Sequence, residues 1–300
     1  MGILFDKIAV IVAGSEKQLD GGNPYTYLGA DGLGAAPRRR LSERGPQQNG
    51  ETDLGYRLDP RVFNLAIQIE AADAGEFWDQ RNDLIGWFAP YHAPIMRFEL
   101  KNGAVRQIDA HLVGDLMMPD DNEYRGTIQR VALQLKAHDP TFYDPVGKSS
   151  TFALGGGGDT FPVPHEVPHG VGASTIDQLN TITYGGNWLS FPQLIRITGP
   201  IEDCVITNET TGDKLDFTGT TIVGGSHYDI DCRYGQKTVI DSGGVNRIAD
   251  LTSDSDLATF HLAPDSAEAP GGVNSIRVTG QSVTEATAVT MNYFERYLGI

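Results

Sequence analysis

The segment that separates two patterns in this sequence is Ala137-His138-Asp139-Pro140-Thr141-Phe142-Tyr143-Asp144-Pro145. Its two prolines stop the strand that enters it, because proline has no backbone N–H to donate and restricts the residue before it. A strand–helix–strand pattern precedes the segment, and short strands joined by glycine turns follow it. We therefore interpret it as a junction between a first domain, residues 1–145, and a second domain, residues 146–300. Phe142 and Tyr143 are expected to pack the last strand of the first domain against the base of the second.

The composition indicates a globular protein with an acidic surface. The 300 residues are 40% hydrophobic and 21% charged, and the net charge is −16. Up to Pro145 there are 15 Lys or Arg and 21 Asp or Glu, a net charge of −6, and the 8 basic and 18 acidic residues beyond it give −10. This balance argues against sequence-independent binding of nucleic acid, which needs cations to neutralise phosphates. No apolar run approaches the roughly 20 residues that span a membrane, so membrane insertion is not expected. Cys204 and Cys232 are expected to be free thiols in a protein made in a reducing cytoplasm.

A long polar segment, residues 15–60, follows a short β-branched strand at residues 7–13. It is rich in glycine and proline, so we expect a loop, and loops of this length inside a domain are usually functional or disordered. Its middle carries four arginines in an otherwise acidic chain, namely Arg38, Arg39, Arg40 and Arg44. Two interpretations remain open: a solvated loop, or an arm that docks on the acidic surface of a neighbouring copy, with these arginines at the subunit interface.

The rest of the first domain predicts a sheet with one helix packed across it. Apolar residues alternate with polar ones over residues 63–70, which is typical of a strand with one buried face. Asp73 is a good N-cap with Glu76 as its capping-box partner, and the apolar spacing that follows predicts a helix over residues 74–88. Further strands are expected at 96–100, 105–114 and 127–137. The first domain is therefore expected to be α+β.

The second domain shows no helical stripe. About ten short strands with regular turn signals are expected, at residues 175–184, 193–198, 203–208, 214–217, 221–223, 228–232, 237–240, 257–262, 275–279 and 287–297. This pattern predicts a β-sandwich or jelly roll. The closing strand is long and apolar on alternate positions, so we expect it to be central. The whole chain is thus predicted to be mainly β with one helix.

No constellation of residues indicates catalysis. His165, Glu166 and His169 lie in a proline-rich loop where no rigid element sets a metal geometry. Two carboxylate pairs, Asp229 with Asp231 and Asp254 with Asp256, lie on a strand face and in a turn. Glycosidase chemistry would need one carboxyl of raised pKa in a cleft. We therefore expect no enzyme, no cofactor and no metal.

A series of short motifs runs through the chain in a fixed order. They are Arg40-Leu41-Ser42-Glu43-Arg44-Gly45-Pro46, Gly50-Glu51-Thr52-Asp53-Leu54-Gly55-Tyr56, Leu58-Asp59-Pro60-Arg61, Phe77-Trp78-x-x-Arg81-Asn82-x-Leu84, the 139–145 junction, Ile206-Thr207-Asn208-x-Thr210-Thr211-Gly212 and Phe294-Glu295-Arg296-Tyr297-Leu298-Gly299-Ile300. In this order they resemble the distal tail proteins of siphophages, and the resemblance covers most of the chain.

The resemblance implies a structural virion protein, assembled in the host cytoplasm and located at the tip of a long flexible tail. The first domain would close into a hexameric ring that joins the tail tube to the tail tip or baseplate. The second domain, often galectin-like in this family, would stand outside the ring. The implied partners are further copies of the chain, the tail tube protein and the tail hub proteins, with receptor-binding proteins or host glycans as further candidates. DNA would pass through the lumen without specific binding.

Two other functions remain open. A β-sandwich that binds carbohydrate in host-surface adhesion could use Tyr184, Trp188 and Tyr228 as a stacking platform, with Phe191 and Tyr234 beside them, although most of these aromatics are expected to be core residues. A virion-associated hydrolase would need a carboxylate pair or a metal site in a cleft.

Overall fold

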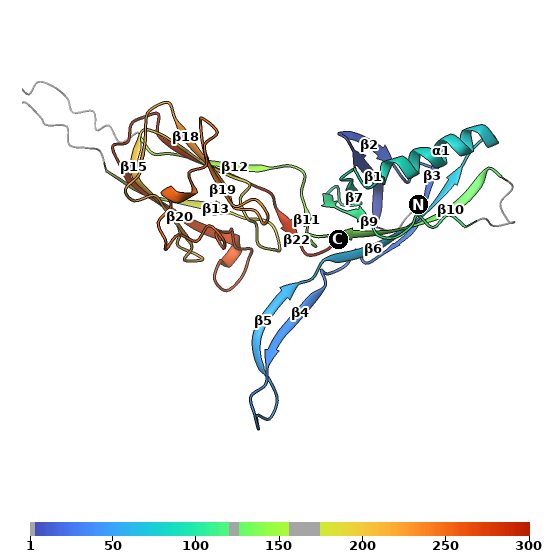
Figure 1. Ribbon diagram of the computed structural model, residues 1–300, viewed down its shortest axis with the longest axis horizontal. Coiled ribbons are helices and arrows are strands. Elements are labelled where there is room, and N and C mark those ends of the chain that lie inside the picture. Colours follow the sequence, from blue (N-terminus) through green and yellow to red (C-terminus); the bar gives the residue numbers. More distant parts are fainter. Residues whose placement is uncertain (1–3, 120–125, 156–174) are drawn as a thin grey trace, which may run out of the picture. The chain divides into compact units, whose positions relative to one another are not determined.

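The computed structural model describes residues 4–119, 126–155 and 175–300. The chain forms two compact units, and each is described by itself (Figure 1). The first unit runs to Pro145 and also contains Tyr297–Ile300, and the second is Val146–Arg296. The last four residues therefore belong to the first unit, whereas the sequence analysis placed the end of the second domain at residue 300.

The first unit holds two sheets that share one hydrophobic core. One sheet has the strand order β2-β1-β7-β8-β11-β22, and the other has the order β3-β6-β10-β9. The strands of the first sheet are β1 (Phe5–Val12), β2 (Ser15–Gln18), β7 (Ile95–Leu100), β8 (Val105–Asp109), β11 (Phe142–Tyr143) and β22 (Arg296–Tyr297). Those of the second are β3 (Tyr25–Asp31), β6 (Arg61–Glu70), β9 (His111–Leu112) and β10 (Ile128–Ala137).

Buried apolar side chains alternate with more exposed ones along β6 and β10, and the buried ones form part of the core of this unit. The two strands pair antiparallel from Arg61 opposite Ala137 to Glu70 opposite Ile128. Directly opposite residues share a face, so one face of the pair carries the buried apolar side chains. These are Phe63, Leu65, Ile67, Ile69, Val131, Leu133, Leu135 and Ala137, and the first four are the apolar residues whose alternation predicted a strand with one buried face.

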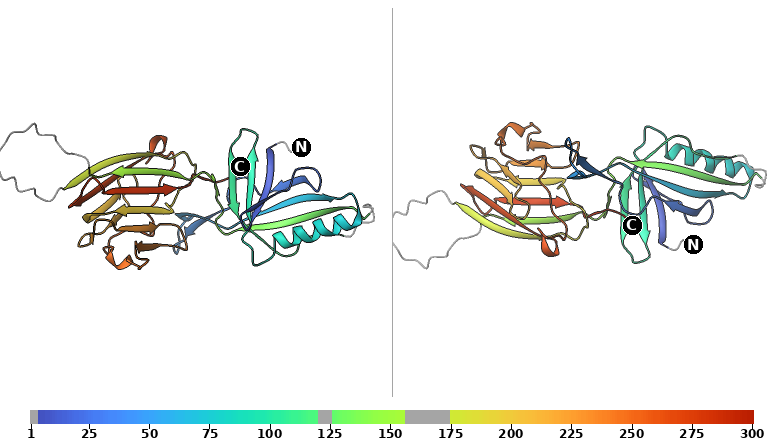
Figure 2. Two further views of the ribbon diagram at one scale, coloured as in Figure 1. Left: turned by 90° about the horizontal axis from the view of Figure 1, so that it is seen from above. Right: turned by 90° about the horizontal axis from the view of Figure 1, so that it is seen from below.

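Helix α1 (Ala74–Trp87) begins and ends where the sequence predicted, within one residue. The Glu76 backbone N–H donates to Asp73 Oδ1 over 2.9 Å, and the Glu76 side chain accepts from the Ala72 N–H over 2.9 Å. The first bond satisfies one of the donors that the first helical turn leaves free, and the second fixes the residue that precedes the N-cap. Phe77 and Leu84 turn towards the core, and α1 lies along one side of the β3-β6-β10-β9 sheet (Figure 2).

The segment expected to be a loop, residues 15–60, is mostly strand, so that prediction was wrong. It contains β2, β3 and a two-stranded hairpin of β4 (Arg38–Glu43) and β5 (Thr52–Leu58). All six β4 residues are exposed, and the β5 residues are exposed or half-buried. Because neither face of the hairpin is buried in the chain itself, its sequence carries no apolar alternation that would mark it as strand.

The second unit is a β-sandwich. One sheet has the order β12-β21-β14-β18-β19, and the other has the order β13-β20-β15-β16, with β17 beside β15. The strands are β12 (Lys148–Ala153), β13 (Ile176–Thr183), β14 (Leu194–Thr198), β15 (Ile201–Asn208), β16 (Lys214–Asp216), β17 (Thr221–Ile222), β18 (His227–Asp231), β19 (Thr238–Asp241), β20 (Val273–Gln281) and β21 (Ala288–Tyr293). Side chains of both sheets meet in one core. The described chain is therefore mainly β with a single α-helix, as predicted.

Three details of the second unit refine the sequence predictions. The closing strand β21 pairs with β12 on one side and β14 on the other, so it is interior as expected. Residues 257–262 do not form a strand. Leu257, Phe260 and Leu262 enter the core from a loop, and Leu262 makes an isolated β-bridge with Ser190. Cys204 and Cys232 are free and buried. Among the described residues, no helix is long and apolar enough to cross a membrane.

Candidate assembly interface

The β4–β5 hairpin projects from the first unit and is the candidate for an interface with a partner. It leaves the unit between β3 and β6 and runs away from the sheets (Figure 1). Its two strands pair only with each other, as a separate two-stranded sheet. An isolated two-stranded hairpin is marginally stable in water and needs a further surface to pack on. The Asp59 N–H donates to Pro37 O over 2.9 Å and closes the base of the hairpin.

The arginines predicted at a subunit interface all lie on this hairpin. Arg40 Nη1 is 2.8 Å from Asp53 Oδ2, and Arg39 Nε is 3.1 Å from Asp59 Oδ2. Arg44 Nε donates to Gln48 O over 3.3 Å. Arg38 makes no ion pair with any described residue. Much of the positive patch expected from the sequence is thus paired within residues 38–59, where five arginines and four acidic residues leave a net charge of +1.

The hairpin also exposes apolar side chains that the sequence analysis did not single out. Leu54 is 57% exposed, Tyr56 53% and Leu41 38%. The pairing register shifts between Leu41 and Ser42, because Leu41 pairs with Gly55 and Ser42 with Asp53, so Leu54 is the extra residue of a bulge. Bulges re-aim a side chain. The hairpin thus carries three partly exposed apolar side chains, Leu41, Leu54 and Tyr56.

The base of the hairpin is held by Arg61, the largest fully buried side chain. Arg61 Nη1 donates to Gly32 O and Gly34 O over 2.8 Å each, and Nε donates to Pro140 O over 2.8 Å. Nη2 donates to Leu298 O over 2.5 Å. Its guanidinium also lies 4.8 Å from the centre of the Phe142 ring. One side chain therefore joins the entry to the hairpin, the end of the first unit's main segment and the C-terminal residues.

Burial lowers the pKa of Arg61 to about 10, because the charged form loses its hydration. Four carbonyl oxygens replace the water, and all of them accept from this one side chain. The sequence analysis quoted Arg61 only as part of a motif. The sequence nevertheless held a signal that Arg61 is buried, because it continues the alternation of residues 63, 65, 67 and 69 on the buried face of one strand.

The C-terminal residues are fixed at the same place. The Ile300 N–H donates to Leu33 O over 3.1 Å. A Cβ on Gly299 would lie 2.5 Å from Gly34 O, so this close approach requires glycine. Arg106 stacks on the Tyr297 ring, with 3.5 Å from its guanidinium carbon to the ring centre. The closing residues of the chain thus brace the hairpin's base.

Phe142 lies in the core of the first unit, which the sequence analysis did not foresee. It is fully buried, and its ring centre is 6.0 Å from that of Phe98 in an edge-to-face arrangement. Tyr143 is half-buried and pairs with Gln107 of β8. Their predicted role at the domain junction stays a prediction.

The aromatics predicted as a sugar platform are mostly inside the second unit. Tyr184 is 2% exposed and Tyr228 7%, so neither offers a face on which a sugar could stack. The Tyr184 hydroxyl donates to Trp188 O, and the Tyr228 hydroxyl donates to Asp250 Oδ2, both over 2.7 Å. Trp188 is half-buried. The platform named from the sequence is corrected accordingly: two of its three members are core residues.

The carboxylate pairs named from the sequence bind cationic side chains or backbone amides. Asp229 accepts two hydrogen bonds from Arg196, and Asp231 pairs with Arg233. A hydrogen bond from Lys214 is the main reason that the pKa of Asp254 falls to about 2, whereas a glycosidase acid needs a raised pKa. In the described residues no cluster of His, Cys, Asp and Glu is placed to hold a metal ion. His165, Glu166 and His169 lie outside the described residues.

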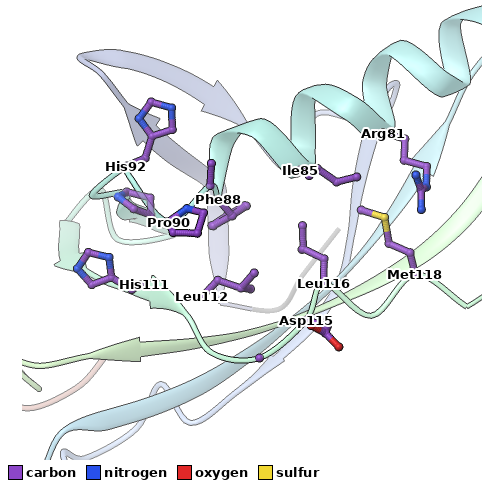
Figure 3. A pocket seen from close by; sticks show the side chains of 13 residues that line it. Arg81, Ile85, Phe88, Pro90, His92, His111, Leu112, Asp115, Leu116 and Met118 are labelled. Carbon is purple, nitrogen blue, oxygen red and sulfur yellow. The ribbon is translucent and has the colours of Figure 1, made fainter.

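A groove of about 630 Å³ lies beside α1 (Figure 3). Ile85 of α1 and Phe88, the residue that follows the helix, form one wall, and Leu112, Leu116 and Met118 form the other. The second wall is held to β10, since Val113 N–H donates to Gln134 O over 2.8 Å and Met117 N–H donates to Ala132 O over 3.1 Å. His92, His111 and Arg81 lie at the ends of the groove.

These features define a class of protein: a chain of two β-rich units, the first of which carries a projecting hairpin with a braced base and a groove beside its helix. No protein-family model and no curated protein matches the sequence. Among solved structures, the chain is similar to the SPP1 Dit protein, described as a paradigm of the hub adsorption apparatus in phages that infect Gram-positive bacteria. The TM-score is 0.63 at 11% identity, over 96% of this chain and 98% of that one.

The chain is also similar to chains in two structures of the phage p2 baseplate in its activated conformation. The structure with strontium gives a TM-score of 0.46 at 9% identity, over 97% of this chain and 98% of that one. The structure with calcium gives 0.47 at 9% identity, over 96% and 97%. The likeness to SPP1 Dit spans both units, so this chain has the fold of that protein, and the resemblance found in the sequence is confirmed at the level of the fold.

Proposed function

We propose that this chain is a structural protein of a phage virion, located at the tip of a long flexible tail, where six copies form a ring between the tail tube and the tail tip or baseplate. The observation that carries the proposal is the match in fold to SPP1 Dit over nearly the full length of both chains. No catalytic role is proposed, because the candidate carboxylates are engaged with basic side chains or backbone amides.

In this proposal the first unit forms the ring and the second unit, a galectin-like sandwich, stands outside it. The β4–β5 hairpin supports self-assembly, since it projects from the unit and exposes Leu41, Leu54 and Tyr56. The partners are neighbouring copies, the tail tube protein on one side and tail hub proteins on the other. The acidic balance of the first 145 residues, a net −6, suits a lumen that DNA passes without binding.

The proposal is tested by removing the hairpin. The Asp59 to Pro37 hydrogen bond brings the hairpin's ends together, so residues 38–58 can be replaced by a short Gly-Ser connection without strain at the base. The intact chain should sediment as a six-copy species and the hairpin-less chain as a monomer with an unchanged circular dichroism spectrum. A variant shortened only at the tip, residues 45–50, serves as the control and should still assemble. Intact rings without the hairpin would contradict its proposed role.

A further inference from the structure

Strand β13 (Ile176–Thr183) is the longest edge strand of the second unit's sandwich. We propose that it receives an extended strand of another tail protein, which pairs with β13 and continues its sheet. The inference rests on the proposed location of the chain at a phage tail tip, because a second tail protein is the partner there.

The pairing of β13 with β20 determines which of its backbone groups are free. The Tyr184 N–H, just beyond the end of β13, donates to Gly272 O over 2.8 Å and therefore points towards β20. The register runs along the whole of β13 without a shift. In an antiparallel ladder, residues that bond to the neighbouring strand alternate with residues whose N–H and C=O point away from it. Residues 177, 179, 181 and 183 therefore direct these groups away from β20.

The other side of β20 gives the same assignment. The Glu209 N–H donates to Ser275 O over 2.8 Å, so the Ser275 carbonyl points towards β15. By the same alternation, the next residue, Ile276, turns its groups towards β13, where it lies opposite Asn180. The outer edge of β13 thus carries the N–H and C=O groups of residues 177, 179, 181 and 183, and no described residue bonds to them.

The two edges on the opposite side of the sandwich are covered by loops. At β19, the Arg247 N–H donates to Val239 O over 2.7 Å. At β16, the Asp256 N–H donates to Lys214 O over 2.7 Å. Strand β12 is a shorter edge and begins with Lys148, whose charge opposes pairing with another strand. Strand β13 has 8 residues and contains no proline, no basic residue and no bulge, so it lacks the features that prevent pairing.

The exposed side chains of β13 indicate the chemistry of the partner strand. Leu179 is 52% exposed. Asp177 and Glu209 share a single cation, Arg277, whose Nη1 is 2.7 Å from Asp177 Oδ1, so one negative charge remains. Opposite charges and apolar pairs stabilise directly opposed positions of neighbouring strands. The partner is therefore an extended segment with a basic residue opposite Asp177 and an apolar residue opposite Leu179, two positions apart.

Such a strand gains affinity from its backbone and specificity from alternate side chains. The four N–H and C=O pairs along the edge are already aligned by β20, so the second unit loses little conformational entropy when the partner binds. The contact needs no cavity and no rearrangement of the sandwich.

The test is hydrogen exchange of the full chain, resolved by residue, in the purified protein and in assembled phage tails. In the purified chain, the amides of Leu179, Thr181 and Thr183 should exchange as open backbone does, whereas Asn180 and Ile182 are protected by β20. In tails, the first three amides should exchange at least about a hundredfold more slowly. Unchanged exchange in tails would overturn the inference. Protection already present in the purified chain would also overturn it, because the edge would then be covered by the chain itself or by another copy.

Two proline variants separate pairing from folding. Thr181→Pro removes an N–H that points away from β20, and proline is tolerated at such edge positions. It should leave the fold intact, and the amides of Leu179 and Thr183 should then exchange in tails as they do in the purified chain. The matched control, Asn180→Pro, removes an N–H that points towards β20 and should lower the unfolding midpoint of the second unit.

Leu179→Lys is a second variant that keeps the backbone unchanged. It places a charge on an exposed edge position, so it should cost little stability and should likewise remove the protection of Thr181 and Thr183 in tails. Protection that persists in tails with both Thr181→Pro and Leu179→Lys would overturn the inference. Tails that contain the chain but leave its β13 edge unprotected would overturn only this inference, whereas absence of the chain from purified tails would contradict the proposed function as well.

Discussion

Replacing Arg61 by methionine should uncouple the base of the hairpin from the rest of the first unit. The substitution keeps the side chain long and apolar but removes every donor that serves Gly32, Gly34, Pro140 and Leu298. A buried acceptor left without a donor costs about 1–3 kcal/mol. Pro140 and Leu298 are half-buried, whereas Gly32 and Gly34 are exposed, so water can replace the lost donor at the two glycines. With part of the cost offset by no longer burying a cation, we expect the first unit to lose about 3 kcal/mol of stability.

Hydrogen exchange resolves this loss by unit. In the Arg61→Met chain, protection factors of β6 and β10 should fall about a hundredfold, since 1.4 kcal/mol corresponds to a factor of ten. Protection of β14 and β21 in the second unit should not change. Arg61→Lys keeps the charge but loses the planar fork, so its effect should be intermediate.

The matched control is Arg38→Met, which removes an arginine from the exposed hairpin. Arg38 makes no ion pair with a described residue, so its loss should cost less than about 0.5 kcal/mol. Equal protection of β6 in the Arg61→Met and Arg38→Met chains would refute the assignment of Arg61 as the clamp of the hairpin's base.

Three further perturbations follow from the packing. Phe142→Ala should destabilise the first unit by about 3–5 kcal/mol in urea unfolding, because it empties a fully buried site, and a cost below about 1 kcal/mol would place the ring outside the core. Gly32→Ala should also be destabilising, because φ is +81° and the new Cβ would lie 2.6 Å from Val62 O; an unchanged midpoint would contradict this geometry. Burial raises the pKa of Cys204 and Cys232 from 9.0 to about 12. The thiols lose their protons at lower pH in the unfolded chain than in the folded chain, so the free energy of unfolding is highest well below pH 9 and falls as the pH rises past it. Between pH 8 and 10 the fall should be about 3 kcal/mol for the two thiols together. A chain with both cysteines replaced by alanine should lose less stability over the same range.

The elements that the sequence predicted are those whose periodicity comes from burial inside their own unit. Strand β6 alternates because one face lies on the core, and α1 is marked by the Asp73 cap and the stripe from Phe77 to Leu84. The β4–β5 hairpin has no such mark, because both of its faces are open in the single chain. Its glycines and prolines therefore indicated a loop.

The candidate site was predicted only in part, for reasons that lie in long-range contacts. The sequence located the arginines of the hairpin but not their neutralisation by Asp53 and Asp59, which depends on strand register. The sequence also contains no signal that the Leu298 carbonyl would accept a hydrogen bond from Arg61, which lies 237 residues earlier in the chain. Tyr184 and Tyr228 belong to a set of aromatics most of which the sequence analysis expected to be core residues, and the packing shows which of them are buried.

We expect copies of this chain to form a ring through the first unit. Native mass spectrometry of the purified full chain, with electron microscopy of the same sample, measures this assembly. The expected result is a species of six copies that appears as a closed six-fold ring and is lost when the hairpin is removed. A chain that stays monomeric at every concentration tested, with or without affinity for sugars, would contradict ring formation.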